Sequence, residues 1–530
     1  MEKYGTAVFG IVKEDNPCAM TMNGMVKGKN RCGIAVFRGI PYGKSTKNGG
    51  RFMPPAEAED WEGIYDATQM GFRCIQETEE QLQQQREGKM PQPVLQIDAV
   101  PEEFGIGQPE YSDEDCLCLN VVTPGLDRKK RPVLVYFHGG GFMSGSGSLV
   151  CGGENLSREE NIVLVGVNHR LNVLGFLYLG GFDEAYAESG NVGLLDLVLA
   201  LKWVQKNIEA FGGDSNAVTI MGESGGGMKV NALMGMPQAR GLFRYAIIES
   251  GSMRVDTRSR HEAHEATLKI MKYLGIEERD WKTLLTLSAA RLFEGTAALT
   301  GLPLGLGPVA DGIHLYYAEE EEYTMPIFSE DIPLLVGASE DEISFTIFPP
   351  MVQVTEETLR ERLLEDDDNW FMHTPAITQR NVDQLLDYAR RERPGNTPYH
   401  TYVWLKSMAG HLTADSYREA MAKAKQRKAP VYYYLVRYDS PLPWNRKERY
   451  SYHTADLPLQ FRMAYFRECE ELSKKMAHSW AAFVRTGSPS TQELPWHPFT
   501  MEEKRTMVWN QISGEESDPI GELWEIFERA

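Results

Sequence analysis

The fold of this chain is indicated most clearly by the stretch Ala217-Val218-Thr219-Ile220-Met221-Gly222-Glu223-Ser224-Gly225-Gly226. Residues 227–234, which follow it, have a helical pattern. The first residues of the stretch form a β-branched run that predicts a strand. A Gly-x-Ser-x-Gly turn between a strand and a helix admits only glycine beside the serine and holds the hydroxyl outward above the sheet edge. Ser224 is therefore a candidate nucleophile. Because the same pentapeptide also occurs in flexible loops, the assignment depends on partner residues elsewhere.

Strand-like and helix-like segments alternate along the chain. Residues 193–210 carry Leu, Val and Trp203 at helical spacing, which predicts a crossover helix. Six short runs have almost no polar positions, which is typical of strands covered on both faces in a mostly parallel sheet. They occupy residues 132–137, 161–168, 217–221, 243–249, 332–336 and 430–438. We therefore expect the α/β class, with a central, mostly parallel sheet flanked by helices.

The length alone is compatible with several domains. The chain contains no internal repeat and no long Pro/Gly/Ser-rich linker. We therefore predict a single catalytic domain over residues 1–530. Residues 75–115 have low hydrophobicity and predict an excursion loop, whereas residues 258–299 and 355–428 are predominantly helical in pattern and are expected to cap the sheet.

The charge balance argues against polyanionic partners. Asp and Glu number 75 against 55 Lys and Arg, and the net charge of −20 repels nucleic acid and anionic membrane surfaces. No apolar run approaches the roughly 18 residues that span a bilayer. Residues 1–10 lack the basic and apolar segments of an export signal. We expect a soluble, cytoplasmic protein that acts on a small molecule.

Seven cysteines, an odd number in a long chain, do not form a disulfide framework. Cys74 and Cys116 remain open as a pair. Cys and His residues nowhere have the spacing of a zinc site, and His261 and His264, one helical turn apart, fit an exposed helix face better. We expect neither a metal nor an organic cofactor.

A second glycine-rich segment precedes the serine by 86 residues. The strand-like run 133–137 leads into His138-Gly139-Gly140-Gly141-Phe142, where glycines allow backbone N–H groups to point into open space. Such donors stabilise the oxyanion of acyl transfer, each by roughly 2.7–4 kcal/mol. A phosphate-binding loop requires a closing lysine followed by Ser or Thr, and residues 139–148 have no lysine. The segment therefore predicts an oxyanion loop.

A serine nucleophile requires an imidazole that accepts its proton and an acid that orients the imidazole. His453 lies in the loop 451–458, shortly after the last predicted strand, which suits the chain order serine, acid, histidine. The acid should follow the strand-like run 332–336. Three candidates stand side by side there, and their spacing does not choose among Glu340, Asp341 and Glu342.

These motifs, in this order, resemble the type-B carboxylesterases, a family that includes cholinesterases and bacterial p-nitrobenzyl-type esterases. The resemblance covers nearly the whole chain and implies the α/β-hydrolase fold. It is carried by residues 37–42, 114–121, 138–142, 168–170, 174–176, 190–213 and 222–226.

The resemblance implies roles for individual residues. It makes Ser224 the nucleophile, Glu342 the acid and His453 the general base and acid. It also implies an oxyanion hole formed by the N–H groups of three glycines, Gly140, Gly141 and Gly225.

Other matches concern the surroundings of these residues. Ser250 matches a buried serine that supports the acid in the family, although a hydrogen-bonded core hydroxyl explains it equally well. Arg170 and Glu223 match structural ion pairs. The cysteines Cys74 and Cys116 match a disulfide of secreted relatives, which cytoplasmic ones need not form.

Three residues depart from the family pattern. Gly225 replaces a usual alanine after the nucleophile, Ile343 replaces a usual glycine after the acid, and Asp456 replaces a usual glutamate three residues beyond the histidine. None of the three removes a reacting group.

We therefore expect a serine carboxylesterase that hydrolyses esters through an acyl-serine intermediate. Cholinesterases bind their cationic substrate with a tryptophan between the cysteines that match Cys74 and Cys116. Residues 75–115 contain no tryptophan, which favours neutral esters. Two alternatives remain: a serine amidase or peptidase of the same fold, and a non-catalytic adhesion protein.

Overall fold

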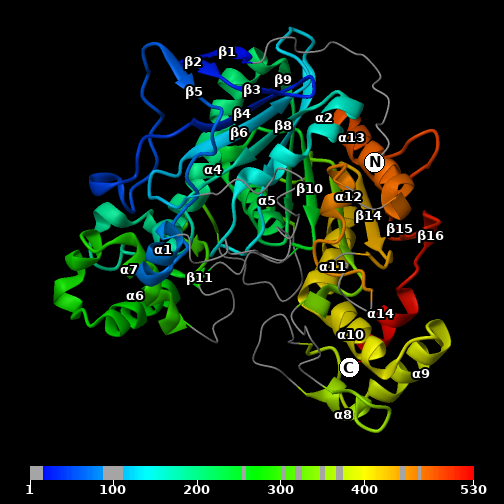
Figure 1. The fold of residues 1–530 in the computed structure, drawn as a ribbon. Coiled ribbons are helices and arrows are strands. Elements are labelled where there is room, and N and C mark those ends of the chain that lie inside the picture. The colour runs from blue at the N-terminus through cyan, green and yellow to red at the C-terminus, as the bar shows by residue number, and fades with distance from the viewer. Residues whose placement is uncertain are drawn as a thin grey trace.

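A computed structural model describes residues 16–87, 111–252, 258–299, 306–316, 325–345, 353–365, 374–441, 449–463 and 467–529. Its centre is an 11-stranded mixed sheet (Figure 1). The strands lie in the order β16 (Gly514–Ser517), β15 (Arg505–Trp509), β14 (Val431–Val436), β13 (Leu334–Ser339), β10 (Tyr245–Glu249), β9 (Gly213–Glu223), β7 (Arg131–Phe137), β8 (Val163–Val167), β6 (Cys118–Thr123), β4 (Ile34–Pro41) and β3 (Lys29–Arg31).

All six predicted strands are found in this sheet. They form its middle as β14, β13, β10, β9, β7 and β8, and every neighbouring pair among them is parallel. The parallel pairing continues to β15, whereas β16 and the β6, β4 and β3 side are antiparallel. The sequence pattern did not reveal these outer strands. Small sheets add β1 (Cys18–Thr21), β2 (Gly24–Lys27) and β5 (Ile64–Asp66), and the pair β11 (Arg258–Ser259) and β12 (Val309–Ala310).

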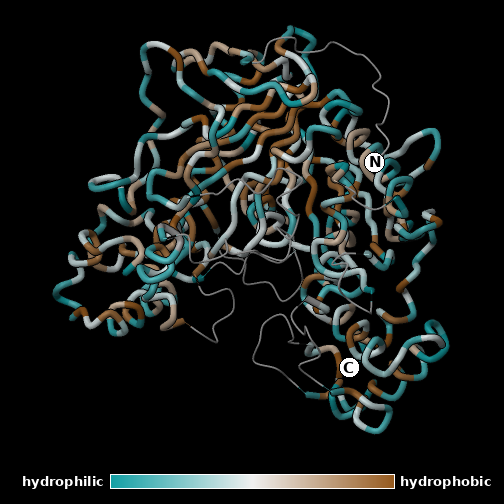
Figure 2. The backbone as a smooth tube through the Cα atoms, in the orientation of Figure 1, coloured by the Kyte–Doolittle hydropathy of each residue, from teal (hydrophilic) through white to brown (hydrophobic). Residues whose placement is uncertain are grey.

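Helices cover both faces of the sheet, as the apolar strands predict. In β7, Val133 and Val135 face one core cluster while Leu134 and Tyr136 face the other. Figure 2 shows these strands as a hydrophobic layer in the middle of the molecule. The first face is covered by α4 (Val192–Asn207), α5 (Gly225–Gly235) and α11 (His411–Lys425), and the second by α2 (Glu154–Glu160), α12 (Leu457–Gln460) and α13 (Glu470–Thr486).

The two regions expected to be predominantly helical consist mainly of helices where the structure describes them, although the first begins with strand β11. They lie on either side of the molecule below the sheet in Figure 1. Residues 258–299 hold α6 (Arg260–Leu274) and α7 (Ala289–Glu294), and residues 355–428 hold α8 (Leu359–Leu364), α9 (Val382–Glu392), α10 (Pro398–Ala409) and α11. Residues 366–373 of the second region are outside the described residues. The single-domain organisation stays a prediction.

Only the ends of the predicted excursion loop 75–115 are described. They contain α1 (Glu79–Arg86), while residues 88–110 lie outside the described residues, as does the N-terminal segment 1–15. Helix α3 (Asn172–Phe176) contacts α4 and α7. Among the helices that the structure describes, none has the length and apolar content needed to cross a lipid bilayer.

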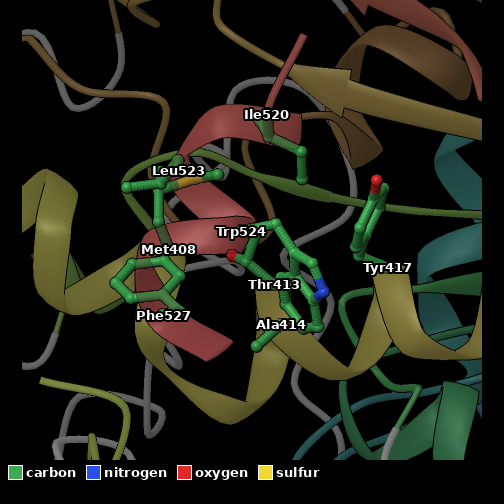
Figure 3. A pocket seen from close by; sticks show the side chains of 8 residues that line it. All are labelled: Met408, Thr413, Ala414, Tyr417, Ile520, Leu523, Trp524 and Phe527. Carbon is green, nitrogen blue, oxygen red and sulfur yellow. The ribbon is translucent and has the colours of Figure 1, made fainter. Parts of the chain in front are cut away.

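The C-terminal helix α14 (Gly521–Glu528) packs against α10 and α11 and leaves only a narrow gap between them. Figure 3 shows Trp524 and Phe527 of α14 beside Met408 and Tyr417. The ring centroids of Tyr417 and Trp524 are 4.9 Å apart. None of the predicted site residues lines this gap, so it is a feature of core packing.

Candidate active site

The predicted site residues come together because neighbouring parallel strands end at the same edge of the sheet. Strands β14, β13, β10, β9 and β7 are consecutive neighbours. Ser224 directly follows β9, Ser250 follows β10, Glu342 follows β13 and the glycine loop 138–142 follows β7. In open α/β sheets this carboxyl edge is where ligands bind.

Ser224 occupies a strained turn between β9 and α5. Its backbone has φ 55° and ψ −126°, a region that non-glycine residues rarely adopt and that costs about 1–3 kcal/mol. Its N–H donates to the carbonyl of Glu249 at 2.8 Å, which ties the turn to β10. The serine is 8 % exposed and therefore not sealed from solvent. The predicted sharp turn is present.

His453 contacts one of the three candidate acids. Its Nδ1 lies 2.5 Å from Oε2 of Glu342. The other two carboxylates point elsewhere: Glu340 pairs with Arg437 at 3.0 Å, and Asp341 accepts a hydrogen bond from the N–H of Ser451 at 3.2 Å. Of the three acids that the spacing left open, Glu342 is the one whose carboxylate contacts the histidine in the structure.

Glu342 is itself held by two hydrogen bonds. The hydroxyl of Ser250 donates to Oε1 at 2.5 Å, and the N–H of Ser339 donates to the same oxygen at 2.7 Å. The side chains of Ser250 and Glu342 are fully buried. A carboxylate fixed in this way cannot rotate freely, so it presents a constant position to Nδ1 of His453.

The other imidazole nitrogen faces a second carboxylate. Nε2 of His453 lies 3.2 Å from Oε1 of Glu223, and in the described part of the chain it makes no hydrogen bond with Ser224. The distance is that of an ion pair, but the contact does not have hydrogen-bond geometry. Both oxygens of Glu223 therefore lack a hydrogen-bond partner among the described residues. Glu223 was expected in a structural ion pair and instead contacts the site histidine.

These contacts change the proton affinities of the site. Burial lowers the pKa of His453, but the carboxylates of Glu223 and Glu342 outweigh it and raise the pKa to about 9. Burial raises the pKa of Glu223 to about 8, although the neighbouring imidazole opposes this. The pKa values of both groups therefore lie above neutral, and their titrations are linked because the two groups are in contact.

Two further buried acids lie in this neighbourhood: Asp456 acts on the charge of His453, and Glu249 is influenced by the charges of Asp456 and Glu223. Asp456 accepts a hydrogen bond from the Tyr434 hydroxyl at 3.0 Å, and burial, followed by the nearby Glu342 charge, raises its pKa to about 6. Glu249 accepts one from Nε1 of Trp480 at 2.6 Å, and burial raises its pKa well above the usual range. The sequence analysis did not place Glu249 near the site. Its position directly before Ser250, at the end of a predicted strand, is the signal that could have placed it there.

The predicted oxyanion glycines have the geometry of a tight loop against α5. Gly140 and Gly141 have φ of 83° and 63°, which favours glycine. A Cβ atom on Gly225 would lie 2.4 Å from the nitrogen of Gly141, so the two backbones are in contact. Among the described residues, none accepts a hydrogen bond from the N–H groups of Gly140, Gly141 or Gly225.

The remaining motif residues have structural surroundings. Arg170 forms a buried ion pair with Asp196, with N to O distances of 2.6 and 2.9 Å, which confirms the prediction for this arginine. Cys74 and Cys116 are buried free thiols, as are the other cysteines that are buried. Within the described ranges no three His, Cys, Asp or Glu side chains cluster as metal ligands would.

Comparisons with known proteins agree with this architecture. A model of the carboxylesterase family matches residues 15–517. The para-nitrobenzyl esterase of Bacillus subtilis (strain 168) is 33% identical over 523 residues, which cover 95% of this chain and 96% of the relative. The cocaine esterase of Homo sapiens is 31% identical and covers 90% of this chain and 84% of the relative.

A solved structure gives the same result for the fold. The crystal structure of a Geobacillus stearothermophilus carboxylesterase superimposes with a TM-score of 0.76 at 32% identity, covering 96% of this chain and 99% of that one. The expected α/β-hydrolase fold is thereby confirmed. The chain therefore belongs to the carboxylesterase family and is a carboxylic ester hydrolase.

Proposed function

We propose that this enzyme hydrolyses neutral carboxylic esters through an acyl-serine intermediate, with Ser224 as the nucleophile. The observation that carries the proposal is the buried chain of contacts from Ser250 through Glu342 to Nδ1 of His453, at 2.5 Å for each contact. An imidazole whose Nδ1–H is held by a carboxylate has Nε2 as its proton acceptor. This arrangement stands at the sheet edge where the strained Ser224 turn lies.

In the first half of the reaction, Oγ of Ser224 attacks the ester carbonyl carbon and its proton passes to Nε2 of His453. Glu342 stabilises the imidazolium that forms. The imidazolium then protonates the departing alkoxide, which leaves as an alcohol and an acyl-serine. Water attacks the acyl-serine by the same route and releases the acid. Catalytic hydrogen bonds often tighten only in the substrate complex, so the bond between Ser224 and His453 is expected there.

The negative charge on the former carbonyl oxygen requires donors. The N–H groups of Gly140, Gly141 and Gly225, which donate to no other described residue, support their assignment as the oxyanion hole. Each such donor contributes roughly 2.7–4 kcal/mol in other serine hydrolases. The reaction needs no group beyond the side chains and backbone named above.

The preference for neutral esters rests on composition and on relatives. Residues 75–115 contain no tryptophan that could bind a quaternary ammonium by its aromatic face. Among the relatives reported above, the para-nitrobenzyl esterase is named for a neutral ester group.

The proposal is tested with a series of p-nitrophenyl esters of increasing acyl length and with Ser224→Ala. Loss of the nucleophile of a serine hydrolase reduces turnover by about 10⁶, so the variant should be inactive on every ester. Ser157→Ala is the matched control, since Ser157 is a buried serine that donates to the carbonyl of Ile162, away from the site. Full activity of Ser224→Ala would overturn the assignment.

A further inference from the structure

Lys229 has a position that the ester hydrolysis described so far does not use. It lies on α5, five residues after Ser224, and its side chain is completely buried. Its Nζ donates a hydrogen bond to the backbone carbonyl of His138 at 2.8 Å and lies 5.8 Å from the centroid of the Phe142 ring. His138 begins the glycine loop and Phe142 ends it. A single amino group therefore contacts both ends of the loop.

Burying an amino group in this environment is unfavourable for the free energy of folding. Lys229 forms no ion pair with a carboxylate in the part of the chain that the structure describes, and a buried ammonium without such a partner destabilises a fold. Another fully buried lysine, Lys423, is better provided for: its Nζ donates to the carbonyls of Ser329 and Glu330 and to the side chain of Gln426. The sparse coordination of Lys229 calls for a reason other than stability.

The helix and the loop are in direct contact along the first turn of α5. A Cβ atom on Gly225 would lie 2.4 Å from the nitrogen of Gly141, and one on Gly226 would lie 2.0 Å from the carbonyl oxygen of Phe137. The loop is thus pressed against the helix, and Lys229 holds it one turn later. Since the carbonyl of His138 and the N–H of Gly139 share one planar peptide group, fixing that carbonyl also fixes the start of the loop.

We propose that Lys229 is a positioning residue that clamps the glycine loop 138–142, so that its N–H groups meet the oxyanion of the tetrahedral intermediate. The inference rests on the proposed function of this loop. Lys229 contacts no reacting atom in this arrangement; it acts through His138 and Phe142. Its removal should therefore weaken binding of the tetrahedral state and leave binding of the ester substrate unchanged.

The clamp does not depend on a full positive charge. Burial lowers the pKa of Lys229 to about 7, while the charge of Glu223 opposes this. Both the ammonium and the neutral amine carry N–H groups, so either form donates to the carbonyl of His138. The imidazoles of His138 and His169, stacked at 5.1 Å, face the same amine; burial and then Lys229 lower the pKa of both, which keeps them neutral.

The test measures ground-state and tetrahedral-state binding in the full-length enzyme. An aryl trifluoromethyl ketone serves as the probe, because Oγ of Ser224 adds to its carbonyl carbon, the hydroxyl proton passes to His453, and the carbonyl oxygen becomes the oxyanion. In Lys229→Met we expect kcat for p-nitrophenyl butyrate to fall about 10- to 100-fold. This decrease is no larger than the decrease in kcat that follows removal of a direct oxyanion donor. Affinity for the ketone should fall by the same factor, with KM unchanged.

Two variants accompany this measurement. Lys423→Met removes a buried lysine whose Nζ contacts Ser329, Glu330 and Gln426, none of which belongs to the site. It should leave kcat and ketone affinity within about twofold of the wild type. Lys229→Gln keeps an N–H donor without the charge and should retain more activity than Lys229→Met. A folded Lys229→Met enzyme with wild-type kcat and ketone affinity overturns the clamp.

The remaining outcomes are also decisive. If Lys229→Met does not fold, Lys229→Gln is measured in the same way; if neither folds, Lys229 is a stability residue and the positioning role is rejected. Ser224→Ala separates this inference from the proposed function. An active Ser224→Ala enzyme refutes the proposed function, whereas an inactive one beside a fully active Lys229→Met enzyme refutes the clamp alone.

Discussion

Ser250 donates a hydrogen bond of 2.5 Å from its hydroxyl to Oε1 of Glu342. The bond spans two neighbouring strands, since Ser250 follows β10 and Glu342 follows β13. It orients the carboxylate whose other oxygen contacts His453. Ser250, which the family resemblance assigned only by its position, thus forms a direct hydrogen bond with the proposed acid.

The first prediction concerns this hydrogen bond. A hydrogen bond to a charged group contributes about 1.5–3 kcal/mol, so Ser250→Ala should lower kcat/KM by about tenfold or more. Glu342→Gln should lower kcat by about 10⁴, as the corresponding change does in another serine hydrolase, because the imidazole loses its orienting charge. Steady-state kinetics with a p-nitrophenyl ester measures both. Equal activities of Ser250→Ala and the wild type would show that Glu342 is held adequately by Ser339 alone.

The second prediction concerns pH. His453 accepts a proton only when neutral, and the Glu223 and Glu342 carboxylates raise its pKa to about 9, so kcat/KM should decline as pH falls below that value. Glu223→Gln removes one raising charge, and the pKa of His453 falls. The acidic limb of the pH profile should then move by about one unit toward lower pH.

The control for this experiment is Glu160→Gln. Glu160 lies 3.1 Å from Nδ1 of the exposed His478, on the α2 and α13 side of the sheet. Its replacement should leave the pH profile of kcat/KM unchanged. A Glu223→Gln profile that superimposes on the wild-type curve would mean that Glu223 has no influence on the proton affinity of His453.

The third prediction concerns the contact between α5 and β7. A Cβ on Gly226 would lie 2.0 Å from the carbonyl oxygen of Phe137, so Gly226→Ala must displace the helix or the strand. We expect a loss of about 1–3 kcal/mol in the free energy of unfolding and a loss of activity, measured by urea denaturation and ester hydrolysis. Gly235→Ala, at the far end of the same helix, meets only Pro326 at 3.6 Å and should leave both unchanged.

The fourth prediction concerns the substrate. Acetylcholine and 3,3-dimethylbutyl acetate have the same shape and differ in charge. Without a tryptophan in residues 75–115, kcat/KM for the choline ester should be lower by about tenfold or more, since a desolvated cation–π contact contributes about 2 kcal/mol. Hydrolysis of the choline ester at an equal or higher rate would contradict the preference for neutral esters. A p-nitroanilide assayed beside its p-nitrophenyl ester distinguishes an amidase from an esterase.

Much of the scaffold was predictable because it depends on local patterns. The runs 132–137 and 217–221 are apolar throughout, and both are inner strands of the sheet, as β7 and β9. The outer strand β4 and the edge strand β16 were not predicted. Gly514–Ser517 is half-exposed and polar, and only its antiparallel pairing with β15 makes it a strand.

The order of the motifs is sufficient to assign a serine turn, a glycine loop, an acid and a histidine to one α/β enzyme. The tertiary structure was needed to show that Glu342 faces His453, that Nε2 lies beside Glu223, and that Lys229 contacts both ends of the glycine loop. The reason is physical. A strand or a tight turn follows from neighbouring residues, whereas these contacts join residues that are 87 to 230 positions apart and depend on strand order, register and the way α5 packs against the sheet.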